Sequence, residues 1–535
     1  MSQLGDFDYI VVGAGSAGCV LAARLSEDVR NRVLLLEAGG EDHNPWVHIP
    51  LGYGRLFRPG PHNWGYRTEP EPELDGREIY QPRGRLMGGS SSINGLIYMR
   101  GQAQDFDRWR QMGNLGWGYD DVLPYFRRAE DQARGADSWH GAGGPLSVSD
   151  QSEPHPLCDA FIAAAQEAGY PYNPDFNGAT QEGAGYYQTT SRRGLRRSTA
   201  RAYLRPARHR ANLAVISGAH ATQILFEGRR AVGVAWDQSG GARNARARAE
   251  VILCTGAINT PQLLQLSGVG PGTLVRGLGL PVVHEAPGVG EDLQDHLQTR
   301  LVYRCTRPIT VNDDLANPLR TAAIGLRWAL LRKGPLTVSA GYAGGFFRTD
   351  PRLETPDIQI HFINFSTGKM GDRLDAFSGF TASACPLRPE SRGWVRAASP
   401  DPHAHPKIQA NYLSTAADRA AIVAGMRLVR GIMTQPAMSP FVAAEVTPGA
   451  PVVSDEDLLA YARASASTLY HPVSTARMGI DPRAVVDPQL RVRGLEGLRI
   501  ADGSVLPDMV SGNTNAAIIM IAEKAADLIV AAARG

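Results

Sequence analysis

Three glycines near the start of the chain restrict its fold more than any other feature of the sequence. Gly13, Gly15 and Gly18 follow an apolar, β-branched run at residues 9–12 and precede a helical pattern of apolar residues. In a strand–turn–helix unit the first glycine forms the turn, the second lets backbone approach a pyrophosphate, and the third lets helix pack on strand. The spacing therefore predicts a Rossmann-type unit that binds a dinucleotide at a helix N-terminus.

A second predicted strand completes this unit. Residues 33–36 are apolar and lead into Glu37, whose carboxylate falls near the expected spacing to accept hydrogen bonds from a ribose diol. The residues that we expect to contact the dinucleotide here are Gly13, Gly15, Ser16, Ala17, Gly18, Glu37 and Ala38. The unit alone does not separate NAD from FAD. Its place at the start of the chain, with a second glycine-rich loop much later, favours FAD.

Length, composition and charge limit the number of domains and the classes of protein to which the chain can belong. A single core stops growing at about 250 to 300 residues, so a chain of 535 residues predicts two domains. Hydrophobic residues at 43% and charged residues at 20% are typical of a globular protein. Lys and Arg number 55 against 53 for Asp and Glu, so the nearly balanced charge creates no electrostatic field that would attract nucleic acid. No run reaches the roughly 18 apolar residues of a membrane span.

Cysteines, the N-terminal segment and a basic cluster carry no predicted site. The five cysteines are scattered without a CxxC pair, so we expect neither a disulfide framework nor a metal site. The segment MSQLGDFDYIVVGAG carries acids where a signal peptide needs basic residues, so it indicates a first strand and a cytoplasmic protein. Arg192, Arg193, Arg196 and Arg197 are expected to form a solvated face.

Three further segments are rich in glycine, serine or asparagine residues and lie in or beside predicted strands. Residues 84–101, GRLMGGSSSINGLIYMRG, form a loop whose small side chains would let backbone lie against a flat ring or a phosphate; the alternative is a flexible surface loop. A strand at 251–254 leads into TGAINTPQLLQLSGVGP. A strand at 498–501, the loop DGSVLPDMVSGNTN and a long helix follow near the end.

Together these segments resemble the glucose-methanol-choline (GMC) family of flavoprotein oxidoreductases over essentially the whole chain. GGSSSIN and GAINTPQLLQLSGVG match the family's two signature segments, and YHPVSTARMG with DGSVLP and NTN matches its catalytic end. The resemblance implies an FAD enzyme that oxidises an alcohol by hydride transfer to flavin N5. It adds Gly88, Ser91, Asn94, Gly95 and Asp502 to the expected cofactor contacts.

Two positions depart from the family pattern. Met87 stands where a branched aliphatic residue is usual, which should not disturb the loop. Ile93 stands where choline-oxidising members of the oxidase type carry a histidine joined covalently to the flavin. Because isoleucine cannot form that bond, we expect FAD to be held non-covalently.

The resemblance also implies the architecture, an α/β protein with two domains. Residues 1–155, 212–305 and 465–535 would form the Rossmann-type FAD domain. Residues 156–211 and 306–464 would form a substrate domain, an antiparallel or mixed sheet covered by helices. The β-rich runs PDIQIHFINF and GWVRAAS and the helical pattern at 416–433 fit this description. Residues 45–66 would be either a loop over the flavin or a packed surface connection.

Alcohol oxidation needs a base beside the flavin, and histidine titrates in the useful range. His471, in YHPVSTARMG, matches the family's catalytic histidine, and Asn513 matches the partner position that follows DGSVLP. The alternative role for Asn513 is a helix cap, for which Asn515 is the better candidate. Asp502 is expected near the ribityl or pyrophosphate group, or else as a structural turn residue.

The substrate remains open at this point. A primary aliphatic, aromatic or polyol alcohol fits the resemblance. Choline is disfavoured because Tyr342 stands where choline dehydrogenases carry an acid, although Tyr342 and Tyr470 could form an aromatic cage for a cation. A non-redox lyase of the hydroxynitrile lyase type is a second hypothesis, and a non-catalytic flavin-binding protein a third. The sequence leaves open an oxygen, quinone or dye acceptor and a monomer or homodimer.

Overall fold

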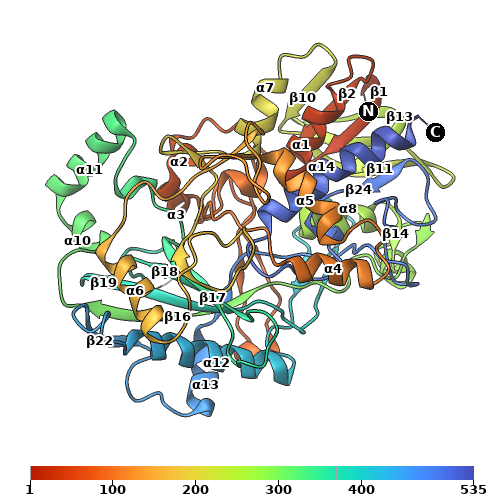
Figure 1. Cartoon of the computed structure of the whole chain (residues 1–535). Coiled ribbons are helices and arrows are strands. Elements are labelled where there is room, and N and C mark those ends of the chain that lie inside the picture. Colours follow the sequence, from red (N-terminus) through yellow and green to blue (C-terminus); the bar gives the residue numbers. More distant parts are fainter. Residues whose placement is uncertain (1, 369–370, 535) are drawn as a thin grey trace.

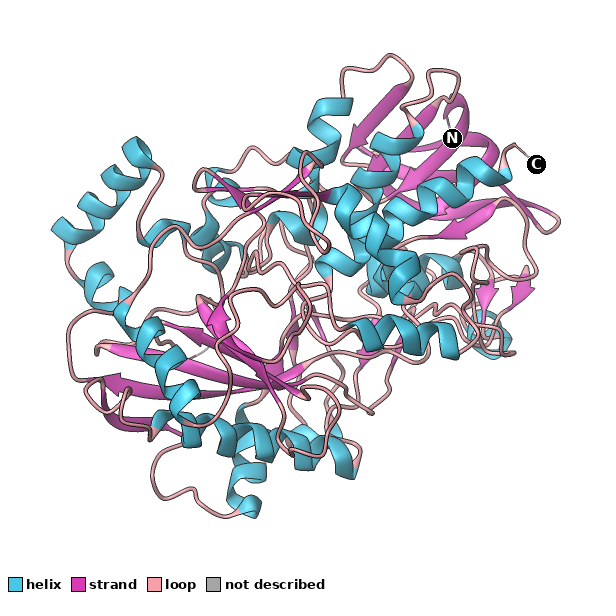
Figure 2. Ribbon diagram, viewed as in Figure 1, coloured by secondary structure: helices cyan, strands magenta, loops and turns pink. Residues whose placement is uncertain are grey.

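The computed structural model describes residues 2–368 and 371–534 and is built on two separate sheets (Figures 1 and 2). The first sheet has the strand order β10-β2-β1-β13-β12-β11, with β24 also paired to β13. Its strands are β1 Ser2–Val12, β2 Val33–Glu37, β10 Leu213–Ser217, β11 His220–Glu227, β12 Arg230–Gln238, β13 Gly241–Leu253 and β24 Leu498–Ile500.

The five strands β10, β2, β1, β13 and β24 run parallel, whereas β11 and β12 form an antiparallel extension. The parallel strands are apolar at residues 9–12, 33–36 and 251–253, where they lie in the middle of the sheet under helices. Helices α1 Ser16–Leu25 and α8 Gly256–Leu266 contact the strands, α14 Asn515–Ala532 packs on α1, and α5 Tyr119–Ala129 packs on α14. Figure 1 shows both chain termini beside this sheet.

The second sheet is antiparallel throughout and has the order β22-β16-β19-β18-β17-β7, with β23 paired to β16. Its strands are β7 Gly183–Tyr186, β16 Leu297–Cys305, β17 Ala343–Phe347, β18 Ile358–Ile363, β19 Gly379–Pro386, β22 Val442–Thr447 and β23 Ser467–Thr468. Helices α6 Pro156–Glu167 and α12 Ala416–Met433 pack on it, and α13 Asp455–Ser465 packs on α12.

The remaining helices and strands lie outside the two large sheets. The helices are α2 Pro45–His48, η1 Pro50–Gly52, α3 Tyr53–Leu56, η2 Pro72–Leu74, η3 Gly89–Ser92, α4 Ala103–Gln111, η4 Ala200–Leu204, α7 Arg205–Ala207, α9 Gly272–Gly277, α10 Val311–Ala316, α11 Pro318–Leu331, η5 Pro335–Thr337 and η6 Gly503–Val505. The strands are β3 Tyr66–Arg67, β4 Tyr80–Gln81, β5 Glu130–Gln132, β6 Leu146–Val148, β8 Ser191–Arg192, β9 Leu195–Arg196, β14 Val269–Gly270, β15 His284–Glu285, β20 Trp394–Arg396 and β21 Lys407–Gln409.

The predicted fold class is confirmed: an α/β arrangement on a Rossmann-type parallel sheet is joined to a second, helix-covered sheet. The helix predicted at 416–433 has the bounds of α12. One domain boundary needs correction, because the sequence analysis placed residues 297–305 with the cofactor domain and the structure pairs them as β16 within the second sheet. This strand is buried along almost its whole length, so its sequence holds no marker of the change of sheet. The other predicted domain boundaries stay predictions.

The C-terminal helix α14 is held by a buried carboxylate. Glu523 is fully buried and forms ion pairs with Arg24 of α1 and Arg128 of α5, and it accepts a hydrogen bond from Tyr203 of η4. A buried anion needs such partners, since an unpaired one would be costly. Glu523 therefore fixes α14 against the helices of the first sheet. Among the described residues, no helix is long and apolar enough to cross a membrane.

Candidate active site

The three fingerprint glycines serve three different purposes. A Cβ at Gly13 would lie 2.6 Å from the carbonyl oxygen of Cys254, and the residue has φ +96°. A Cβ at Gly18 would lie 1.8 Å from the carbonyl oxygen of Gly13. At Gly15 the nearest atom would be 3.8 Å away, so the space in front of this residue is open. The first and third glycines are thus required by packing, whereas the second leaves room for a ligand.

Glu37 ends β2 beside this opening. Its carboxylate accepts hydrogen bonds from the backbone N–H groups of Ala14, at 2.9 Å, and Gly39, at 2.8 Å. Burial raises the pKa of Glu37 to about 7, and the two backbone donors oppose this rise. Hydroxyl donors from a ribose diol would stabilise the carboxylate further, which matches its predicted role.

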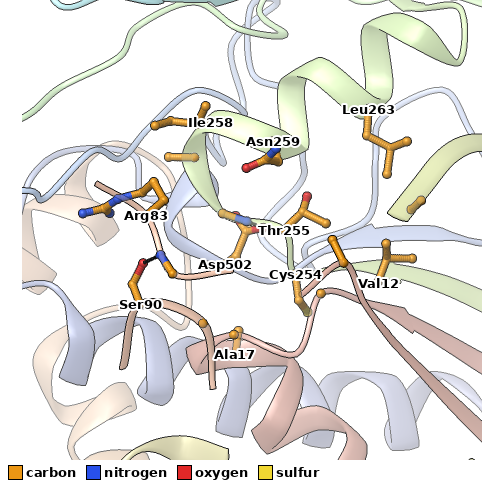
Figure 3. A pocket seen from close by; sticks show the side chains of 18 of the residues that line it. Val12, Ala17, Arg83, Ser90, Cys254, Thr255, Ile258, Asn259, Leu263 and Asp502 are labelled. Carbon is orange, nitrogen blue, oxygen red and sulfur yellow. Dashed lines mark hydrogen bonds between the residues drawn. The ribbon is translucent and has the colours of Figure 1, made fainter. Parts of the chain in front are cut away.

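These groups line a first cavity, shown in Figure 3, where Ala17, Ser90 and Thr255 surround the same space. From the expected cofactor contacts it brings together Gly13, Gly15, Ser16, Ala17, Glu37, Ala38 and Asp502. The carboxylate of Asp502 accepts from the N–H of Gly256, the hydroxyl of Thr260 and both donors of Ser504. Asp502 therefore fixes the start of α8 at the cavity wall. Gly18 does not line the cavity.

The glycine and serine loop rests directly on the fingerprint. A Cβ at Gly89 would lie 2.7 Å from the Cα of Gly15. Gly88 and Ser91 do not line a cavity, because the hydroxyl of Ser91 is buried, donates to the carbonyl of Gly88 and lies 2.9 Å from the hydroxyl of Thr199. These two residues shape the loop from inside, whereas Asn94 and Gly95 lie on its cavity side.

A second cavity continues from the first. Both are lined by Ser16, Arg83, Ser90, Thr514 and Ile518. The second cavity also holds His471, Asn513 and the aliphatic side chain of Ile93. The dinucleotide end and the predicted catalytic end therefore form one continuous space. Residues 45–66 contribute to both parts, with Trp64 in the first cavity and Tyr53 and Phe57 in the second, so this segment covers the site.

A chain of hydrogen bonds fixes which nitrogen of His471 carries the proton. The Nε2 of His296 lies 2.9 Å from the carbonyl oxygen of Leu387, which can only accept, so this nitrogen must be the donor. In a neutral ring the Nδ1 of His296 is then a bare acceptor, and it lies 2.9 Å from the Nδ1 of His471. His471 must therefore donate through Nδ1. Its Nε2 therefore carries a lone pair and no proton.

The amide of Asn513 is oriented in the same way. Its Oδ1 accepts from the side chain of Gln359 at 3.2 Å, so its Nδ2 is the group that lies 3.2 Å from the Nε2 of His471. One amide hydrogen can point to that lone pair while the other remains for a ligand. A base and a donor thus meet side by side in the second cavity.

The site keeps His471 neutral and in place. Burial, with the cation of Arg83, holds the pKa of His471 well below its usual range. The backbone N–H of His471 donates to Asp295 at 2.7 Å, and the same carboxylate accepts from the hydroxyl of Thr468. Tyr470, just before the base, has φ +69°, a strained conformation of a kind that clusters at active sites.

Two expectations about neighbouring residues are wrong. Asn515 does not cap α14, because the cap position is Thr514 and the Oδ1 of Asn515 instead accepts from the hydroxyl of Ser16 at 2.7 Å. Tyr342 cannot form a cage with Tyr470, because its hydroxyl donates to the carbonyl of Glu153 and its ring packs against Tyr186. Tyr470 does line the second cavity, whereas Tyr342 does not.

The basic cluster is also not uniformly solvated. Arg192 and Arg193 are exposed, but Arg196 is only 1% exposed and donates to the carbonyl oxygens of Val47 and Ser91 and to the Oδ1 of Asn94. Arg196 thus supports the loop from behind. His296, Gln359 and Arg196 were missed because each acts on a residue far away in the sequence.

No metal centre is indicated in the part of the chain that the structure describes, where no cluster of three ligating side chains occurs. All five cysteines are buried as free thiols. The chemistry of the site therefore rests on the two cavities and the His471–Asn513 pair.

A Rossmann-type sheet with a continuous cavity leading to a neutral histidine defines a cofactor-dependent oxidoreductase of the flavoprotein class. The chain belongs to the GMC oxidoreductase family. Residues 7–298 match the family's N-terminal model and residues 389–522 its C-terminal model. Proteins of this family bind FAD, and the suspected resemblance is confirmed.

Similar proteins cover nearly the whole chain. The mitochondrial choline dehydrogenase of Homo sapiens is 46% identical over 533 residues, 98% of this chain and 90% of that protein. An alcohol dehydrogenase [acceptor] of Pseudomonas putida is 43% identical over 530 residues, 98% of this chain and 96% of its own length. The crystal structure of pyridoxine 4-oxidase from Mesorbium loti superposes with a TM-score of 0.89 at 32% identity, covering 97% of this chain and 98% of that one.

The contrast between glycines gives a first prediction. Gly15→Val should fold, since no atom lies closer than 3.8 Å to its Cβ, but it should lose FAD because the side chain occupies the approach of the pyrophosphate. Gly18→Ala should instead impair folding, because its Cβ would meet backbone at 1.8 Å. Flavin absorbance per protein and circular dichroism of both variants are the measurements. A Gly15→Val protein that retains full FAD content would contradict the assignment.

Proposed function

We propose that this protein oxidises an alcohol to an aldehyde or ketone, with non-covalently bound FAD, His471 as the base and Asn513 as a hydrogen-bond donor to the reacting oxygen. The observation that carries the proposal is the bare Nε2 of a neutral, buried His471 beside the Nδ2 of Asn513, in a cavity continuous with the dinucleotide site. Family membership and relatives named as alcohol and choline dehydrogenases support it.

The two side chains divide the work on the hydroxyl group. The hydroxyl takes the place of the direct contact between the two side chains, so that it donates to the Nε2 of His471 while its oxygen accepts from the Nδ2 of Asn513. The O–H proton moves to Nε2, a hydride leaves the same carbon, and the carbonyl double bond forms. FAD supplies the acceptor for that hydride when it is bound. The resulting imidazolium still donates through Nδ1 to His296, so the ring keeps its orientation throughout.

The proposal leaves the substrate among primary aliphatic, aromatic and polyol alcohols, and the acceptor as oxygen or a quinone or dye. A monomer or homodimer and a cytoplasmic location stay predictions. The competing lyase function would use His471 without net oxidation. Anaerobic bleaching of the flavin by an alcohol separates the two, because a lyase leaves the flavin oxidised.

Non-covalent attachment predicts that acid precipitation releases FAD into the supernatant. The reason is chemical, because Ile93, at the cavity position where oxidase-type members carry the linking histidine, has no nucleophilic atom. Absorbance of supernatant and pellet is the measurement. Ile93→His serves as a comparison for a linkable side chain, and yellow colour that stays with the wild-type pellet would show a covalent bond elsewhere.

His471→Ala should lower the rate of flavin reduction by roughly 10² to 10⁴-fold, the range that a general base supplies, with FAD content unchanged. Asn513→Ala should have a smaller effect, since the amide positions the oxygen without moving the proton. The losses in the double variant should not add, because the two groups act on one hydroxyl. Anaerobic stopped-flow absorbance measures all three. An undiminished rate in His471→Ala would exclude this mechanism.

His296→Leu tests the tautomer. Without an acceptor for its Nδ1–H, the ring of His471 can present a protonated Nε2 to the substrate, so reduction should slow by about 10 to 100-fold. The pH profile gives the second readout. The rate falls as pH drops through the pKa of His471, which in wild type lies well below its usual range, and loss of the neutral His296, whose Nδ1 accepts from the ring and stabilises its protonated form, should move this fall to still lower pH. A slower variant with an unshifted profile would indicate a merely structural role for His296.

A further inference from the structure

We propose that the alcohol substrate carries an anionic group, a carboxylate in the simplest case, which binds to Arg300 and Tyr53 in the second cavity, away from the base. This deepens the proposed function and rests on it for the identity of the reacting hydroxyl. The binding of the anion is tested separately below.

The guanidinium of Arg300 has no ion-pair partner among the described residues. It lies on β16 and lines the second cavity. Its Nη2 is buried without a hydrogen-bond partner, and no ion pair to it occurs within the described part of the chain. Two buried arginines elsewhere are paired, Arg100 with Glu130 at 2.5 Å and Arg499 with Glu250 at 2.5 Å, and the buried Arg196 donates to three neutral oxygens. A buried, unpaired guanidinium is costly unless a ligand supplies the missing charge.

A second orphaned donor lies near the first. The hydroxyl of Tyr53, in α3, is buried and also has no partner. Tyr53 and Arg300 line the same cavity, and burial raises the pKa of Tyr53 while the guanidinium of Arg300 is the largest opposing influence. Burial likewise raises the pKa of Tyr470 to about 12, again with Arg300 as the largest opposing influence. A planar guanidinium and a phenol are donors suited to a carboxylate.

Position on the strand sets the separation between anion and base. Gln298 and Arg300 share one face of β16 and line the cavity, and His296, one residue before the strand, continues this alternation and contacts the base. At about 3.3 Å per residue, the Cα of Arg300 lies about 13 Å along the strand from that of His296. The carboxylate and the reacting carbon are thus separated by several atoms. An apolar chain or an arene would fit beside Phe57 and Leu469.

The same charges disfavour a cationic substrate. The side chains that line the second cavity within the described residues include Arg83 and Arg300 and no carboxylate. Asp295, the nearby acid beneath His471, already accepts from Gln81, Tyr412 and Thr468. A quaternary ammonium would therefore meet like charge, although similar proteins are named choline dehydrogenases.

The test compares substrates of matched shape on the holoenzyme. We expect 4-(hydroxymethyl)benzoate to reach half-maximal flavin reduction at a concentration about 10 to 100-fold lower than 4-(hydroxymethyl)benzamide, the range of a charge-assisted hydrogen bond. A series of ω-hydroxycarboxylates of three to eight carbons, each against its amide, locates the best length. Choline should be the poorest substrate. If no carboxylate is preferred over its amide, or if choline is preferred, the proposal is overturned.

Variants assign the effect to the two side chains. Arg300→Met should abolish the preference for carboxylate over amide, and Arg300→Lys should keep part of it. Tyr53→Phe should cost less, because one neutral donor is lost. Arg300→Met removes a buried unpaired charge, so its thermal unfolding midpoint and FAD content should not fall. A carboxylate preference that survives Arg300→Met would overturn the assignment.

Binding without turnover separates this proposal from the proposed function. The inert anion 4-methylbenzoate should raise the thermal unfolding midpoint of wild type and not that of Arg300→Met, because a ligand stabilises only the state that binds it. If no alcohol bleaches the flavin yet 4-methylbenzoate still stabilises only wild type, the oxidation is wrong and the anion site stands. If alcohols bleach the flavin and 4-methylbenzoate has no effect on either protein, the oxidation stands and the anion site is wrong.

Discussion

The hydrogen bond between the two Nδ1 atoms of His296 and His471 is the interaction on which the chemistry of this structure depends. His296 immediately precedes β16 of the second sheet, and Asn513, on the other side of the base, lies two residues before α14, which belongs to the first sheet's layer. The base is therefore held between the two halves of the molecule. Any relative shift of the sheets would change its distance to one neighbour or the other.

Burial makes this arrangement possible. An imidazole in water near neutral pH exchanges its proton freely and samples both tautomers. Inside the protein, desolvation holds the pKa of His471 and His296 low, so both rings stay neutral and the order of donors is set by the carbonyl of Leu387. A carbonyl cannot donate, and this single property propagates through two rings to leave a lone pair at Nε2. The same logic orients Asn513 through Gln359.

The sequence predicts local and repeated features well. The fingerprint glycines, the strand that ends in Glu37 and the helix at 416–433 follow from spacing and periodicity, and the predicted fold class is confirmed. Motif resemblance identified both His471 and Asn513, and the structure places the two side chains in contact. The partner of His471 could not be found in this way, since His296 is 175 residues away and is brought close by the pairing of β16 with β23 and by the bridge between Gln294 and Val473. Arg196 was misassigned because a local charge run indicates a surface, whereas its burial depends on the distant loop that it supports.

Unpaired arginines around the second cavity lower the stability of the folded state in favour of function. Burial lowers the pKa of Arg83, Arg196 and Arg300, that of Arg196 to about 9, and no carboxylate among the described residues forms an ion pair with any of them. Such charges weaken the folded state, and a stable core would pair or replace them. Yet removal of a hydroxyl proton places negative charge on the substrate oxygen, and Arg83, which donates to the carbonyl of Tyr470 next to the base, is a fixed cation that can stabilise this charge. Arg83 and Arg300, two unpaired cations that line one cavity in a protein that pairs Arg100 and Arg499, are therefore better explained by anions that the cavity holds than by the needs of the fold.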